Sequence, residues 1–112
     1  MSHTDLIKAK RFNKNKLNWS LTSMVALEPM IKVLMFGATK YSPNNWKKGM
    51  NYTTIYDSMQ RHLNSFMSGE DIDPESKLHH IGHILCNSMF LSWMIVFKPE
   101  LDDRNKDPKN LL

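Results

Sequence analysis

The stretch "FMSGEDIDPESKLHHIGHILC", residues 66–86, decides the fold, because it joins two helix-patterned segments through a short acidic connection. Before it, apolar residues recur at helical spacing over about 54–68. After it, Asp73 is a good helix N-cap, Pro74 suits a first helical position, and Pro99 limits the helix to about residue 97. Because the connection "GEDID" is short, the sequence predicts an antiparallel helix hairpin of about 54–68 and 74–97.

A further helix is expected upstream of the hairpin, in "SMVALEPMIKVLMFGATK", residues 23–40. Its apolar residues form a broad helical stripe. Proline is well tolerated only in a first turn, so Pro29 places the regular start near Glu28, and Gly37 offers a stop. No alternation of period two persists long enough to predict a strand. The expected fold is therefore all-α, a small bundle of three main helices.

The chain divides into three regions by composition. Residues 1–19 are basic and polar and are expected to be flexible, residues 20–97 are expected to form the helical domain that carries any functional site, and residues 98–112 are expected to form a polar C-terminal tail. A packed part of about eighty residues supplies only about 3–5 kcal/mol of stability, so self-association is expected to complete the bundle.

Composition also narrows the class of protein. With one cysteine, Cys86, no intrachain disulfide can form. Charge-free apolar runs are expected to fall short of the roughly 18–20 residues of a membrane span, and the start lacks the apolar centre of a signal peptide. These features favour a reducing cytoplasm, and the formal net charge of +4 favours an anionic partner.

Histidines on the two hairpin helices are predicted to face one another. His80, His83 and Asn87 follow at spacings of three and four, so they share one stripe of their helix. His62 lies on the apolar face of the other helix. At 1.5 Å per residue, His62 lies about 9 Å before the end of its helix and His80 about 9 Å past the start of its own. The two imidazoles should therefore sit at similar height.

Acidic side chains crowd the same end of the hairpin. They are Glu70, Asp71, Asp73 and Glu75. Oxygen-rich ligation suits Mg²⁺ or Mn²⁺, whereas two or three histidines favour Mn²⁺, Zn²⁺, Co²⁺ or Fe²⁺. Taken singly, His62 has a plainer reading as a core histidine, Asp73 as a cap, and the acidic connection as a solvated turn. Their convergence favours a divalent metal site.

The connection "GATKYSPNNWKKG", residues 37–49, is cationic, aromatic and rich in amides. Its lysines, Lys40, Lys47 and Lys48, can neutralise phosphate, Tyr41 and Trp46 offer faces on which a base can stack, and Asn44 and Asn45 can read base edges. The alternatives are a tryptophan that packs in the core and lysines that are simply solvated. Gly37 and Gly49 are expected to supply positive φ at element ends.

Two segments, "FGATKYSPNNWKKG" and "RHLNSFMSGEDIDPESKLHHIGHILCNSMFL", resemble a phage-encoded domain family named for dATP/dGTP diphosphohydrolase. Its members share G-A-x-K-Y-x-x-x-N-W-x-x-G, then R-H-L, G-E-x-x-D-x-E-S and H-x-x-H-x-x-x-N, and the resemblance covers about residues 20–93. The characteristic positions are Gly37, Lys40, Tyr41, Asn45, Trp46, Gly49, Arg61, His62, Glu70, Asp73, Glu75, Ser76, His80, His83 and Asn87.

The resemblance implies an all-helical protein that acts on purine deoxynucleoside triphosphates in the cytoplasm of a phage-infected bacterium, releasing diphosphate and leaving the monophosphate. This chemistry calls for a divalent ion, Mg²⁺ or Mn²⁺ first and Zn²⁺ or Co²⁺ as alternatives. The expected catalytic residues are His62, Arg61 and Glu75. The expected metal ligands are a subset of Glu70, Asp73, Glu75, His80 and His83. The expected substrate-binding residues are Lys40, Tyr41, Asn45, Trp46, Arg61 and Asn87.

Two departures and two alternatives accompany the resemblance. Lys77 replaces a glycine that commonly follows the E-S pair, expected as a mild change in the first turn of a helix, and the E-x-x-E and E-x-x-D motifs of MazG-like pyrophosphohydrolases are absent. The main alternative is a non-catalytic phage protein that sequesters a host defence signalling nucleotide. Nucleic acid is not an expected partner, because only the basic N-terminal segment supports it.

Overall fold

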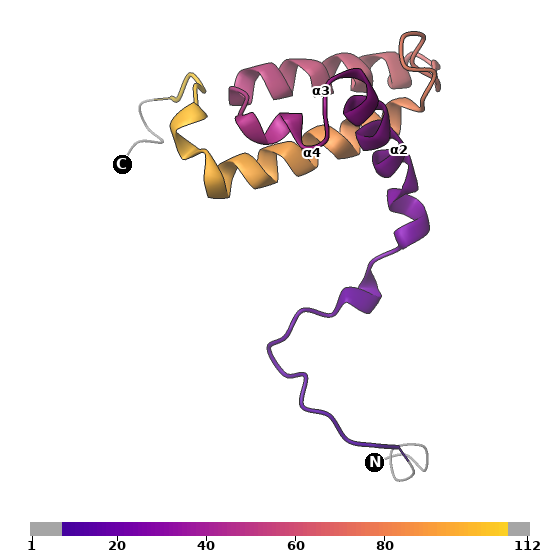
Figure 1. Ribbon diagram of the computed structural model, residues 1–112, viewed down its shortest axis with the longest axis vertical. Helices are drawn as coiled ribbons and strands as arrows, with labels where there is room; N and C mark the ends of the chain where they lie inside the picture. The colour runs from indigo at the N-terminus through magenta and orange to yellow at the C-terminus, as the bar shows by residue number, and fades with distance from the viewer. Residues whose placement is uncertain (1–7, 108–112) are drawn as a thin grey trace.

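The computed structural model describes residues 8–107 and is built from helices (Figure 1). Helices α3 (Tyr52–Met67) and α4 (His80–Phe97) form an antiparallel hairpin, and α2 (Met24–Lys40) packs across α4 near the hairpin connection. Three single 3-10 turns complete the described part: η1 (Trp19–Leu21), η2 (Asn45–Lys48) and η3 (Pro99–Leu101). Residues 8–107 contain no strand, so the all-α prediction with three main helices is confirmed, while oligomerisation stays a prediction.

Helix α2 is longer at both ends than the sequence predicted. It starts at Met24 because Ser23 is an effective N-cap, whose Oγ accepts a hydrogen bond from the Ala26 amide at 3.2 Å. Pro29 lies inside the helix and removes only the amide that would bond to Val25, an exposed residue whose carbonyl water can reach. The expected stop at Gly37 is also wrong, because the helix continues to Lys40.

The hairpin connection is longer than predicted, because α4 starts at His80 and not after Asp73. Residues 68–79 form a closed loop instead of a helical first turn. Asp73 Oδ2 accepts from the Ser76 amide at 2.8 Å, and the Asp73 amide donates to the Leu78 carbonyl at 2.8 Å. The cap is His79, whose Nδ1 accepts from the Ile81 amide at 3.0 Å. The predicted helix of 74–97 is therefore wrong over its first six residues, 74–79.

Lys77 explains why this loop leaves the helical path. Its φ of +64° lies in the left-handed region, which glycine adopts without steric cost. The glycine that commonly occupies this position in the resembling motif would be relaxed there. The expectation of a mild change in a helical first turn is corrected, since Lys77 is the left-handed residue of a loop.

Helices α2 and α4 cross in close contact at one glycine. A Cβ on Gly82 would lie 2.5 Å from the Pro29 carbonyl oxygen and 3.0 Å from Val33 Cγ2. Only a residue without a side chain fits between the two helices at this point. The crossing fixes how far the C-terminal end of α2 stands from the hairpin.

The core lies at the end of the hairpin away from the loop. Tyr52, Ile55 and Met94 are buried there, and the partly buried residues around them are Trp46, Met50, Phe90, Leu91, Trp93 and Leu101. Residues after α4 extend this packing: Asp103 accepts hydrogen bonds from the Thr53 amide at 3.0 Å and hydroxyl at 2.6 Å. The described part of the predicted polar tail, 98–107, therefore holds the start of α3.

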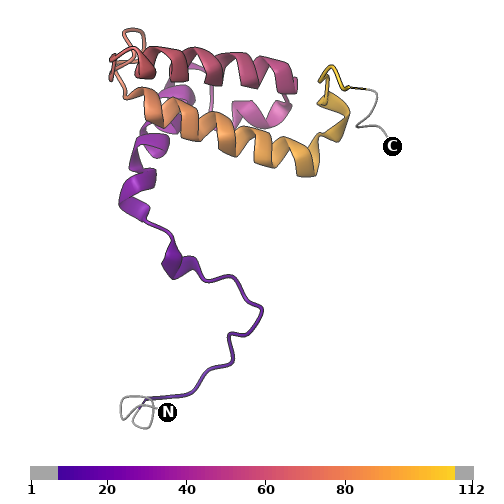
Figure 2. The ribbon, with the colours of Figure 1, turned by 180° about the vertical axis from the view of Figure 1, so that it is seen from behind.

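The N-terminal segment, residues 8–23, runs away from the helices as an extended arm (Figure 2). All its residues are exposed, including four large apolar ones: Phe12, Leu17, Trp19 and Leu21. The radius of gyration is 19.1 Å, against about 13 Å for a compact chain of this length. Residues 1–7 and 108–112 of the predicted end segments lie outside the described residues.

Helix α4 corrects the expectation that no apolar run reaches membrane-spanning length. His80–Phe97 is long and apolar enough to cross a membrane by length and composition alone. Both α2 and α3 pack against it, and His80 and Asn87 are buried on its packed side. These contacts are those of a central helix in a bundle.

Candidate functional site

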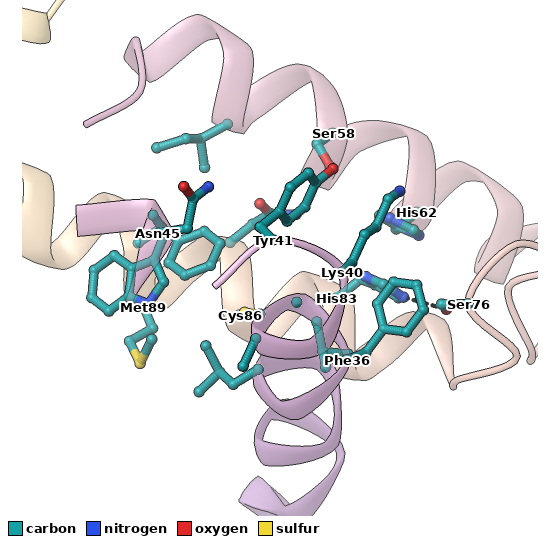
Figure 3. A pocket seen from close by; sticks show the side chains of 18 of the residues that line it. Phe36, Lys40, Tyr41, Asn45, Ser58, His62, Ser76, His83, Cys86 and Met89 are labelled. Carbon is teal, nitrogen blue, oxygen red and sulfur yellow. Dashed lines mark hydrogen bonds between the residues drawn. The ribbon is translucent and has the colours of Figure 1, made fainter. Parts of the chain in front are cut away.

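A pocket of about 1270 Å³ opens where α2, the following connection and the hairpin meet (Figure 3). Figure 3 shows Lys40 at the end of α2, Tyr41 and Asn45 from the connection that follows it, and His62 and His83 on the helices of the hairpin. Small-molecule sites occupy roughly 300–1,000 Å³, so a nucleotide fits with room for solvent. The pocket brings together the cationic connection and the histidines that the sequence predicted to share one site.

One end of the pocket, termed the imidazole end, consists of His62, His80, His83, Asp73 and Glu70. His62 Nδ1 and His80 Nδ1 are 2.9 Å apart, which confirms that the two residues lie at similar height. The ring of His83 stacks on that of His62, with centroids 4.2 Å apart and planes 3° from parallel. The histidines meet as predicted, although α4 starts at His80 and not near residue 74. The loop 68–79 covers the distance that was predicted to be helical.

Carboxylates approach this end from the loop. Glu70 Oε1 is 2.7 Å from His80 Nε2, and a carboxylate only accepts, so this nitrogen carries the proton. Asp73 lies beside the rings. His62, Asp73 and His80 each offer one atom that could bind a metal ion, and these three atoms lie within 4.8 Å of one another. His62, predicted to act on water, therefore joins Asp73 and His80 as a potential metal ligand.

The other predicted metal ligands have different partners. His83 Nε2 is 2.7 Å from the Ser76 hydroxyl, which also accepts from the Leu78 amide, so this nitrogen is already engaged. Glu75 lies at the exposed mouth, where its Oε1 accepts from Lys40 Nζ at 3.0 Å. This pair ties the end of α2 to the hairpin loop.

Local environment shifts the ionisation of this end. Burial lowers the pKa of His62 and of His83 below 6.5, and neighbouring imidazoles lower both further. For Asp73, burial favours the protonated form, but hydrogen bonds from Ser76 outweigh it and the pKa is lowered. At neutral pH the two rings are therefore uncharged beside an ionised carboxylate.

The opposite end of the pocket, termed the aromatic end, consists of Trp46, Phe90 and Asn45. Trp46 stacks on Phe90 with ring centroids 4.8 Å apart and meets Trp93 edge-on at 5.1 Å. Trp46 is therefore first a packing residue, although it also lines the pocket. Lys47 and Lys48 are both exposed, and Lys48 also lines the pocket. Gly49 has the expected positive φ of 108°, whereas Gly37 lies inside α2.

Between the two ends, polar and apolar side chains share the pocket lining, among them Ser58, Cys86 and Asn87. Asn87 is 9% exposed, and its Nδ2 donates to the Ser58 hydroxyl at 3.3 Å. Burial raises the pKa of the Cys86 thiol to about 12, which leaves it unreactive. Tyr41 and Arg61 are exposed residues of the lining. Ser58 and Phe90 also line the pocket and were not among the predicted site residues, although Ser58 stands four residues before His62 on the same helical stripe.

A family profile described as "dATP/dGTP diphosphohydrolase, N-terminal" matches residues 7–104. The chain belongs to this family. A relative named dATP/dGTP diphosphohydrolase, from Salmonella phage PMBT28, is 32% identical over 94 residues, which cover 84% of this chain. The chain spans 32% of the length of that relative. No solved structure matches the chain.

Membership of the dATP/dGTP diphosphohydrolase N-terminal family confirms the resemblance seen in the motifs. The matched region, 7–104, contains both ends of the pocket, the loop with Lys77 and the helix crossing at Gly82. The family match and the pocket therefore describe the same part of the molecule.

Proposed function

We propose that this pocket binds a purine deoxynucleoside triphosphate and hydrolyses it to the monophosphate and diphosphate, in the cytoplasm of a phage-infected bacterium. The observation that carries the proposal is that one pocket holds both ends. His80 and Phe90 are ten residues apart on α4, about 15 Å at 1.5 Å per residue. That length suits a triphosphate at the imidazole end and a base at the aromatic end.

Cationic side chains at the pocket mouth suit the phosphates. Lys40 and Arg61 both line the pocket, from α2 and α3 respectively. Lys40 is held by Glu75 in an exposed ion pair, which contributes little to stability and is easily exchanged. An entering phosphate attracts Lys40 and frees the Glu75 carboxylate. The remaining contacts proposed for the nucleotide are from Asn87 to the sugar and from Tyr41, Asn45 and Trp46 to the base.

The reaction breaks the anhydride between the α- and β-phosphates. A water attacks the α-phosphorus, the bond to the bridging oxygen breaks, and diphosphate leaves with that oxygen. Glu75, once released from Lys40, accepts the proton of the attacking water, and Arg61 offsets charge on the equatorial oxygens. A divalent ion held among the imidazole and carboxylate groups would neutralise phosphate charge and polarise the water. After product release, Glu75 returns the proton to solvent.

The test is direct. The purified full chain is incubated with each of the four dNTPs and with Mg²⁺, Mn²⁺, Co²⁺ or Zn²⁺, and products are followed by ³¹P NMR. We expect diphosphate and monophosphate from dATP and dGTP. Glu75→Gln should lower turnover at least tenfold with little change in nucleotide affinity, and Glu28→Gln, the same change at an exposed position outside the pocket lining, is the matched control. Nucleotide that binds but returns intact after heat denaturation would instead identify a sequestering protein.

A further inference from the structure

We infer that the imidazole end is a mixed histidine–carboxylate metal site, formed by His62, His80 and Asp73, which takes a first-row transition ion in preference to Mg²⁺. This ligand set differs from the one expected from sequence. The role of the metal rests on the proposed function, whereas the metal site itself rests on three contacts.

The first contact is the pair of nitrogens. His62 Nδ1 and His80 Nδ1 are 2.9 Å apart. Two nitrogens bonded to one ion at about 2.1 Å lie about 3.0–3.4 Å apart, so a shift of a few tenths of an ångström admits the ion. Without metal, the short separation requires a proton between the two atoms. His80 Nε2 carries its proton toward Glu70, so His62 Nδ1 is the donor.

The second contact prepares His80 as a ligand. With Nε2 donating to Glu70 Oε1 at 2.7 Å, the neutral ring has its lone pair on Nδ1, the atom that faces His62. Metal-binding histidines in proteins regularly donate their other N–H to a carboxylate, which fixes the tautomer and the ring orientation. His80 is only 2% exposed, so this orientation is also held by packing. Transfer of the His62 proton from Nδ1 to Nε2 then exposes the second lone pair without net change of charge.

Asp73 completes the ligand set, and His83 is left out of it. Asp73 supplies a carboxylate oxygen within the 4.8 Å group. His83 does not join, because its Nε2 is bonded to Ser76 and its ring supports His62 from one face. Two nitrogens and one oxygen favour Mn²⁺, Co²⁺ or Zn²⁺, whereas Mg²⁺ requires oxygen ligands.

The test measures metal binding with no nucleotide present. The untagged full chain, treated with EDTA and dialysed, is titrated with ZnCl₂, CoCl₂, MnCl₂ and MgCl₂ by calorimetry at pH 7, and the Co²⁺ complex is also followed by its visible absorption. We expect one ion per chain, with Zn²⁺ bound tighter than Co²⁺, Co²⁺ tighter than Mn²⁺, and Mg²⁺ at least 100-fold weaker than Zn²⁺. His62→Ala or Asp73→Asn should weaken Zn²⁺ binding at least 100-fold.

Two further variants separate a metal site from a merely structural cluster. Glu70→Gln, at an exposed loop position, should weaken Zn²⁺ binding 10–100-fold without loss of helix content by circular dichroism. Asp71→Asn, the same change as Asp73→Asn at an exposed position of the same loop outside the pocket lining, is the control and should bind Zn²⁺ within about threefold of the unmodified chain. The inference is overturned if no transition ion binds, if Mg²⁺ binds as tightly, or if Asp71→Asn loses as much affinity as Asp73→Asn.

The outcome is distinguishable from failure of the proposed function. Tight Zn²⁺ or Co²⁺ binding by a chain that hydrolyses no dNTP supports the metal site and removes the reaction. Hydrolysis with Mg²⁺ by a chain that binds no transition ion supports the reaction and removes this metal site.

Discussion

The two ends of the pocket are built in opposite ways. At the imidazole end, His62, His80 and Glu70 bond mainly to one another. At the aromatic end, Trp46 and Phe90 belong to the cluster around Met94 that holds the hairpin together. The first end owes its order to a local network of hydrogen bonds, whereas the second owes it to the core.

This difference predicts how each end responds to substitution. Removing a group from the imidazole end should alter ligand binding more than folding, because its contacts are hydrogen bonds and ring stacking among the site residues and lie outside the apolar cluster around Met94. Removing a group from the aromatic end should alter both at once. The predictions below test that contrast, from the largest expected change in the free energy of unfolding to the smallest.

Trp46→Ala should give the largest loss. Trp46 stacks on Phe90 and meets Trp93, so its removal leaves a cavity beside the core, and we expect the free energy of unfolding to fall by about 2–4 kcal/mol. Urea denaturation followed by circular dichroism measures the change. The neighbouring exposed variant Lys47→Ala should stay within about 0.5 kcal/mol. Equal effects of both variants would show that the aromatic end is not built on the core.

Gly82→Ala should come second. Its Cβ would lie 2.5 Å from a backbone oxygen of Pro29, so α2 and α4 must separate, at a cost of about 1–3 kcal/mol. Gly37→Ala, inside helix α2, is the matched control, since nothing lies within 4 Å of its Cβ position, and it should stabilise by about 0.5–1 kcal/mol. Thermal unfolding of both variants checks the opposite signs.

Acid should destabilise the imidazole end selectively. The pKa values of His62 and His83 are lowered in the folded state, so the unfolded chain binds more protons below pH 6.5. The contribution of these two histidines to the free energy of unfolding is therefore fully present above pH 6.5 and is lost as the pH falls below it. In EDTA-treated protein, the urea midpoint should fall between pH 7 and pH 5. The double variant His62→Gln/His83→Gln should show a shallower fall, and an unchanged slope would contradict the assignment.

Lys77→Gly should give the smallest change and a gain. At φ +64° a side chain is strained and glycine is not, so we expect about 0.5–1 kcal/mol of added stability. Differential scanning calorimetry measures the shift in Tm. Lys98→Gly, just past α4 at φ −137°, is the control and should give no gain.

The hairpin and the meeting of its histidines could be predicted from sequence, because apolar spacing and the chain reversal determine which helical faces meet. The start of α4 could not, because Asp73 and Pro74 suit a tight loop as well as a helical first turn, and the left-handed conformation of Lys77 decides between them. The start of α2 was also predicted wrongly, because Pro29 was expected to lie in the first helical turn. The loss of one exposed hydrogen bond at Pro29 is outweighed by the packing of α2 on α4.

The sequence predicted which residues meet in the candidate site, but it did not predict the role of each residue. His62, Asp73 and His80 come together, yet the sequence cannot show that Ser76 engages His83 or that Lys40 engages Glu75. Those pairings depend on the path of the loop 68–79. Trp46 has both of the readings that the sequence allowed, since it packs in the core and also lines the pocket.

The contact at Gly82 has a mechanical consequence. Where α2 meets α4, Gly82 of α4 lies directly against the Pro29 carbonyl and the Val33 side chain of α2, so no space remains between the two helices. The two helices cannot move closer together at this point without a steric clash. We therefore expect the pocket to adjust to a bound molecule at its rim, where the exposed ion pair between Lys40 and Glu75 can separate at little cost.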